Sequence, residues 1–128
     1  MESHQKVLFI DAATAFYRIN RFTVGKPFFG PIDLGLHLSG RYRSLNIGTG
    51  LLAGSIFPGA NRLFFNGFSP CCTGFYVSSM GGAGLVFDNV GVNMISMINR
   101  ASAPSILYLN RNRGEEVEVI IEKVSMNR

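Results

Sequence analysis

A cluster of glycines limits how this chain can fold more than any other feature of its sequence. Gly81, Gly82 and Gly84 fall within four residues, directly after an aromatic, apolar run (residues 75–77) and directly before a segment patterned as a short helix. A strand that breaks at glycines and resumes as a helix leaves backbone N–H groups unpaired where the helix starts. Because those groups lie at the positive end of the helix dipole, the pattern favours a bound anion.

A turn about twenty residues earlier carries a single cation. Residues 58–62 read Pro-Gly-Ala-Asn-Arg, so Arg62 follows the turn and precedes an apolar strand. Its forked guanidinium suits a phosphate or a ring carbonyl. The two turns together predict a site for a phosphorylated ligand. The alternative readings are a tight turn where backbone passes backbone for the glycines, and an ordinary solvated side chain for Arg62.

The glycine pattern fits neither of the common phosphate-binding motifs. A dinucleotide fingerprint needs a βαβ unit, whereas the strands here are predicted to be antiparallel. A Walker loop needs Gly-Lys-Ser/Thr, which does not follow Gly84.

Composition predicts one small domain over residues 1–128, part of whose surface is covered by a partner. The chain has 128 residues and is 47% hydrophobic, which is enough for a core. Charged residues make up only 16%, against about a quarter in an average domain. We therefore expect this chain to be a piece of something larger.

The charge distribution argues against nucleic acid. The formal net charge is +4, but the arginines are scattered in pairs along the chain. Nucleic-acid-binding domains usually carry a denser basic patch with interleaved aromatics, so RNA binding is kept only as a third reading. No apolar stretch is long enough to span a bilayer and no secretory leader is recognisable. We expect a cytoplasmic protein with no membrane contact.

Two adjacent cysteines, Cys71 and Cys72, are the only ones in the chain. Neighbouring cysteines are poorly placed for a normal disulfide, and two thiols cannot complete a four-thiolate cluster or a structural zinc site. Free thiols suit a reducing compartment. No Ser/His/Asp set, metal-ligand cluster or acid–base pair of carboxylates stands out. We therefore expect no catalytic residue and no metal ligand in this chain.

Hydrophobic patterning predicts an α+β fold dominated by antiparallel sheet. Two short helices are expected, at residues 32–38, with Pro31 in the first turn, and at residues 81–89. A basic loop is expected at residues 40–44. Strands are expected at residues 6–11, 15–20, 45–47, 62–65, 74–79, 93–98, 105–110 and 117–124.

Several linked motifs between residues 54 and 93 carry a family resemblance. They are Gly54-Ser55, Pro58-Gly59, Arg62-Leu63, Ser69-Pro70, Gly74, Ser79-Met80-Gly81-Gly82-Ala83, Phe87 and Asn89-Val90-Gly91-Val92. Taken together they resemble the amino-terminal domain of the tungsten-containing aldehyde ferredoxin oxidoreductase family. The motifs are most similar to those of the glyceraldehyde-3-phosphate branch. The resemblance implies a two-sheet saddle beneath a tungstopterin (or molybdopterin) cofactor.

The resemblance also implies which residues hold the cofactor and what is missing. The implied cofactor-binding residues are Asn61, Arg62, Ser79, Met80, Gly81, Gly82 and Ala83. Complete family members are several times longer, and their cluster-binding cysteines and acid–base residues lie in later domains. The implied function is a cofactor-binding subunit or fragment of an oxidoreductase that converts an aldehyde to a carboxylate. A larger partner subunit would hold the iron–sulfur cluster and pass electrons to ferredoxin. The alternative is a non-catalytic anion-binding or assembly module that keeps the fold without the cofactor.

Overall fold

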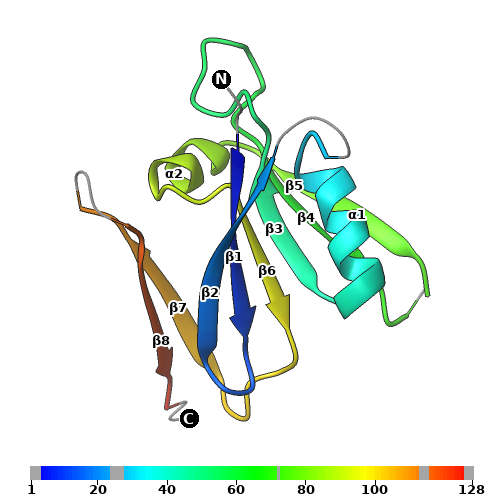
Figure 1. Ribbon diagram of the computed structural model, residues 1–128, viewed down its shortest axis with the longest axis vertical. Coiled ribbons are helices and arrows are strands. Elements are labelled where there is room, and N and C mark those ends of the chain that lie inside the picture. The colour runs from blue at the N-terminus through cyan, green and yellow to red at the C-terminus, as the bar shows by residue number, and fades with distance from the viewer. Residues whose placement is uncertain (1–3, 24–27, 72, 113–115, 126–128) are drawn as a thin grey trace.

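The protein is built on one six-stranded sheet with a separate two-stranded hairpin. Its computed structural model describes residues 4–23, 28–71, 73–112 and 116–125. The strands are β1 (His4–Asp11), β2 (Phe16–Thr23), β3 (Leu45–Thr49), β4 (Leu63–Phe68), β5 (Phe75–Met80), β6 (Met94–Ile98), β7 (Ser105–Asn110) and β8 (Glu118–Lys123). The large sheet has the order β2-β1-β6-β3-β4-β5, and β7 pairs with β8 (Figure 1).

The predicted α+β class is confirmed, with one exception to the antiparallel pattern. Every pair of neighbouring strands is antiparallel except β1 and β6, which run parallel. Parallel neighbours need a long crossover connection, and here the chain between β1 and β6 supplies four strands and both helices. Local sequence patterns cannot reveal such a pairing, because its two partners are more than eighty residues apart.

Helix α1 (Pro31–Tyr42) covers one face of the sheet. Proline suits the first turn because its φ is already helical. The Asp33 carboxylate accepts hydrogen bonds from the amides of Phe29 (2.6 Å) and Gly30 (2.8 Å), which would otherwise be unpaired at the helix start. Partial burial on its own would raise the pKa of Asp33, but these amides and that of Leu34 hold it below its ordinary value.

The helix continues to Tyr42, so the prediction of a basic loop at residues 40–44 is wrong for residues 40–42. Gly40 is exposed in the helix and costs it only about 1 kcal/mol relative to alanine. The buried hydroxyl of Ser39 donates to the Ser44 carbonyl at 3.0 Å. Arg43 then ends the helix in the left-handed region (φ 55°). The Ser39 bond, with those from the Asn46 side chain to the Gly35 carbonyl and Ser39 Oγ, outweighs the weak local propensity.

A buried polar cluster sets the position of α1 on the sheet. The side chain of Asn46 is fully buried, as is that of Asn66 beside it on β4. The Asn46 amide nitrogen lies 2.8–3.1 Å from three acceptors, and its oxygen accepts from two hydroxyls. The partners are the Gly35 carbonyl, Ser39 Oγ, Asn66 Oδ1, Ser44 Oγ and Ser96 Oγ. Because any slip of the helix would leave these groups unpaired, the cluster fixes its register.

The hairpin packs against the opposite face of the sheet, through side chains of β1 and β6. Figure 1 shows it on the side of β2, away from β5. The core on this side contains the buried side chains Leu8, Ile10, Val92, Ile95 and Val117, against which the hairpin packs Leu107, Leu109, Val119 and Ile121. The alternation predicted for the last strand is confirmed, since Val119 and Ile121 face this core while Glu118, Ile120 and Glu122 are exposed.

Two further observations complete the fold. In the described ranges no helix combines the length and the apolar character needed to cross a membrane. Cys71 is exposed and free, while Cys72 lies outside the described residues. The sequence Asn112-Arg113-Gly114 also predicts a turn, of which residues 113 and 114 lie outside the described residues.

Candidate functional site

The predicted site residues gather at one end of the sheet. Strand β5 is the outermost strand beside β4, and it ends at Met80. The chain then turns through residues 81–83 and enters helix α2 (Gly84–Asn89). The loop that follows β3 projects from the same end, at the top of Figure 1, and returns to β4 through Asn61 and Arg62. Two segments about twenty residues apart therefore meet, as the sequence predicted.

Asn61 ties the two segments together. Its side-chain oxygen accepts a hydrogen bond from the amide of Gly54 at 2.7 Å, which closes the projecting loop. Its backbone carbonyl accepts from the amide of Gly84 at 3.0 Å, at the start of α2. The expectation that the amides at the helix start are all unpaired is therefore wrong for Gly84. Helix α2 also begins three residues later than predicted.

The three clustered glycines have different structural roles. A Cβ on Gly84 would stand 2.7 Å from the backbone carbon of Asn61 and 2.9 Å from the Arg62 carbonyl, so only glycine lets the two backbones approach. Gly82 has φ +82°, a conformation that favours glycine, while no neighbour lies within 4 Å of a Cβ on Gly81 or Gly82. Gly84 thus fits the tight-turn reading, and Gly81 and Gly82 leave an open stretch of backbone.

Arg62 places an uncompensated positive charge beside this backbone. It is exposed, and its Nη1 donates to Ser79 Oγ at 3.4 Å, across the strands β4 and β5. The ion pairs among the described residues join Lys6 and Arg21 to Glu116, and none includes Arg62. The weak contact with Ser79 orients the guanidinium while leaving most of its donors free.

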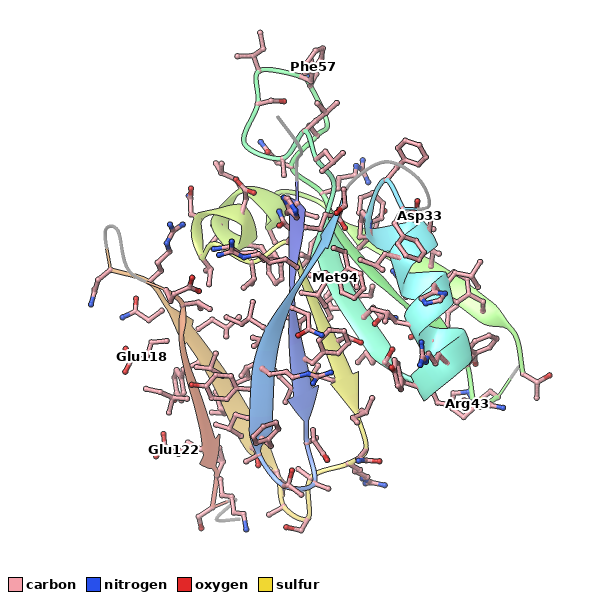
Figure 2. All side chains as sticks on the ribbon, in the orientation of Figure 1. Asp33, Arg43, Phe57, Met94, Glu118 and Glu122 are labelled. Carbon is pink, nitrogen blue, oxygen red and sulfur yellow. The ribbon has the colours of Figure 1, made fainter. Side chains whose placement is uncertain are left out.

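Exposed apolar side chains surround the turn. Met80 is 56% exposed and Val86 on α2 is 68% exposed. On the projecting loop, Ile56 is 97% exposed and Phe57 57%, and Figure 2 shows Phe57 at the outer tip. Side chains of this kind suit contact with a flat heterocycle or with another protein surface.

The site in this chain is an open surface suited to binding and orienting a ligand. Two cavities, of about 480 and 450 Å³, lie elsewhere, beside residues 100–107 and between β2 and α1. Within the described residues, no group of three His, Cys, Asp or Glu side chains could hold a metal ion. Exposed amides, one free guanidinium and apolar neighbours can hold an anionic heterocycle by its phosphate or its ring edge.

Two residues that position the site were absent from the predicted set. Gly54 (φ +80°) donates to Asn61, and Gly84 admits the Asn61 backbone. Both glycines belong to the sequence motifs, so their presence was visible. Their roles were hidden because each depends on a contact between segments that are distant in the sequence.

Comparison with known proteins identifies the family of this chain. The model of the aldehyde ferredoxin oxidoreductase N-terminal domain matches residues 24–125. The glyceraldehyde-3-phosphate:ferredoxin oxidoreductase of Pyrococcus furiosus is 38% identical over 81 residues, which are 63% of this chain and 12% of that protein. An uncharacterized protein of Methanocaldococcus jannaschii is 42% identical over 62 residues, which are 48% of this chain and 10% of that protein.

A solved structure shares the fold. The active-site complex BamBC of benzoyl coenzyme A reductase, in complex with 1,5-dienoyl-CoA, contains a chain that matches 96% of this chain with a TM-score of 0.74 and 20% sequence identity. The match covers 20% of that chain. The present chain therefore spans about an eighth or less of the curated relatives it matches and a fifth of this structural one. The chain belongs to the aldehyde ferredoxin oxidoreductase family, of which it carries the N-terminal domain, and its resemblance to the glyceraldehyde-3-phosphate branch is confirmed.

Proposed function

We propose that this chain holds the organic part of a tungsten- or molybdenum-pterin cofactor within a larger aldehyde oxidoreductase. The observation that carries the proposal is the convergence of Arg62 with the open backbone of Gly81 and Gly82 at one end of the sheet. These residues fit the cofactor, because no described residue beyond their chain neighbours lies within 4 Å of a Cβ on either glycine.

Each residue of the site has a distinct part in this proposal. Arg62 donates hydrogen bonds to a phosphate or a ring carbonyl of the pterin and offsets its negative charge. The backbone at residues 81–83 approaches the ring edge closely, because glycine has no side chain to keep it away. Asn61 holds the loop and the helix start in register through its bonds to Gly54 and Gly84. Ser79 and Met80 line the approach from β5.

The remaining parts of the reaction are proposed to lie on other polypeptide. When bound, the metal-pterin group would supply the two-electron oxidation of an aldehyde and water to a carboxylic acid. The electrons would leave through an iron–sulfur cluster on a partner subunit and reach ferredoxin indirectly. A cytoplasmic location and glyceraldehyde 3-phosphate as substrate are part of this proposal. The small share of its relatives that the chain covers supports a larger partner.

A pair of arginine variants tests the assignment of Arg62. The protein would be purified together with its partners, and its pterin measured by fluorescence after oxidation. Arg62→Gln removes the charge and keeps similar bulk, and we expect at least tenfold weaker pterin retention with little change in thermal stability. Arg100→Gln, an exposed arginine outside the site, serves as the control. Equal retention in the two variants would remove Arg62 from the site.

A second function, a cofactor-free assembly module, is favoured by the exposed apolar tip of the projecting loop. Ile56 and Phe57 have the exposure of side chains that dock against another protein. Native mass spectrometry separates the two functions. The cofactor-binding function requires a large hetero-complex that contains pterin, whereas the assembly function requires a complex that forms without it.

A further inference from the structure

A second cavity, on the opposite side of the sheet from the hairpin, combines an apolar lining with cations. Its volume is about 450 Å³, and it is lined by residues of β1, β2, β6 and the C-terminal half of α1. Phe9, Phe22 and Leu38 supply apolar lining, and Leu38 is almost fully buried. Cavities of this size and character are typical of sites for small organic molecules.

Two arginines at this cavity have no acidic partner in the part of the chain that the structure describes. Arg18 lies over the Phe9 ring, with its guanidinium carbon 5.9 Å from the ring centroid, and Arg41 lies over Tyr42 at 5.3 Å. Apart from these ring contacts, neither arginine side chain makes a hydrogen bond or an ion pair with any described residue. These cation–π contacts hold each guanidinium near its ring and leave its N–H donors free to bind an anion.

The other polar side chains at the cavity leave it a net positive charge. The cavity is also lined by Asn20, His37 and Tyr42. Their side chains make no hydrogen bond to a described residue, and each can donate one. Asp11 is the one carboxylate of the lining, and no ion pair joins it to either arginine. Its Oδ1 accepts from the Asn99 side chain and from the Ala13 amide, both at 3.0 Å. That carboxylate is thus satisfied by its own turn and by Asn99, which follows β6.

We propose that this cavity binds a small organic anion with an apolar body, such as an aryl or branched-alkyl carboxylate. The carboxylate takes the free donors of Arg18 and Arg41, and the hydrocarbon part packs against Phe9, Phe22 and Leu38. An inorganic anion would leave this apolar lining unfilled, and a neutral hydrocarbon would leave the two charges unpaired. The site is separate from the turn at Gly81 and Gly82, so it does not depend on the cofactor proposal.

Three probes of matched shape or charge test this proposal on the full chain. Phenylacetate carries both the apolar ring and the negative charge. Phenylacetamide has the same shape without the charge, and acetate has the charge without the ring. Binding would be followed by titration in ¹H–¹⁵N NMR spectra. We expect phenylacetate to bind with a dissociation constant of about 1 mM or tighter, with shifts at residues of the cavity. Phenylacetamide is expected to bind at least tenfold more weakly, and acetate without measurable saturation.

Variants then assign the charge recognition to the two arginines. Arg18→Gln combined with Arg41→Gln should weaken phenylacetate at least tenfold and leave phenylacetamide unchanged. Arg43→Gln is the control, because Arg43 also lies over an aromatic ring, that of Phe68, but outside this cavity. The proposal is overturned if phenylacetate fails to bind, if phenylacetamide binds equally well, or if the folded double variant binds phenylacetate like the wild type. Should the double variant not fold, the comparison of the three probes on the wild type decides.

Discussion

Replacing Gly84 with alanine tests whether the close approach of two backbone segments builds the site. The added Cβ would lie 2.7 Å from the Asn61 carbon, and an ordinary contact is about 3.4 Å, so the two segments must separate by about 0.7 Å. Crowding of this kind costs about 1–3 kcal/mol, and stretching the hydrogen bond from the Gly84 amide to the Asn61 carbonyl costs about 1 kcal/mol more. Alanine recovers up to about 1 kcal/mol through its higher helix propensity.

The net expectation for Gly84→Ala is a loss of about 1–3 kcal/mol in the free energy of unfolding. Urea denaturation followed by circular dichroism measures it. Gly81→Ala is the matched control, because a Cβ there meets no atom within 4 Å, and its stability should stay within about 0.5 kcal/mol of the wild type. A Gly84→Ala protein as stable as the wild type, or an equal loss in both variants, would refute this account of the turn.

Three further predictions concern helix α1 and its contacts. Gly35→Ala should lower the free energy of unfolding by about 3 kcal/mol or more, because its Cβ would collide with the buried side-chain oxygen of Asn66. Gly40→Ala should raise it by about 0.5–1 kcal/mol, because a Cβ there meets open space. Urea midpoints that shift in the same direction for both variants would contradict this. Asn46→Ala should lower the free energy of unfolding by about 3–5 kcal/mol, because several buried partners lose their hydrogen bonds. A decrease below about 1 kcal/mol in the same assay would show that the buried polar cluster contributes little to stability. The pKa of Asp33 is lowered in the folded state. Its contribution to the stability of the fold is therefore complete above its ordinary pKa near 4, and it is lost as the pH falls through the pKa of the folded state. Asp33→Asn should therefore flatten the acid limb of a plot of stability against pH, and an unchanged limb would contradict the cap.

The sequence predicted most elements because their patterns are local. The alternation of Val119 and Ile121 with charged neighbours identified the last strand, and Pro31 marked the start of α1. The end of α1 was missed because Ser39, which is buried against β3 and accepts a hydrogen bond from Asn46, outweighs the low helix propensity of Gly40. The same limit explains why Asn46, an ordinary strand residue in sequence, was not recognised as the centre of a buried cluster.

The candidate site was predictable as a set of residues, but its internal contacts were not. Linked motifs pointed to Arg62 and to the glycine turn, and the fold places them at one end of the sheet. The different structural roles of the three glycines could not be predicted from the sequence, because each role depends on which atoms a Cβ at that position would contact in the fold. Gly84 meets the Asn61 backbone, whereas Gly81 and Gly82 meet open space.

The metal content of the native complex tests the central claim most directly. The protein would be purified with its partners under anaerobic conditions, and tungsten and molybdenum would be measured by mass spectrometry against the amount of this chain. Our account predicts about one atom of one of these metals for each copy of the chain, together with pterin. An intact hetero-complex that contains neither metal and no pterin would contradict it and would favour the assembly function.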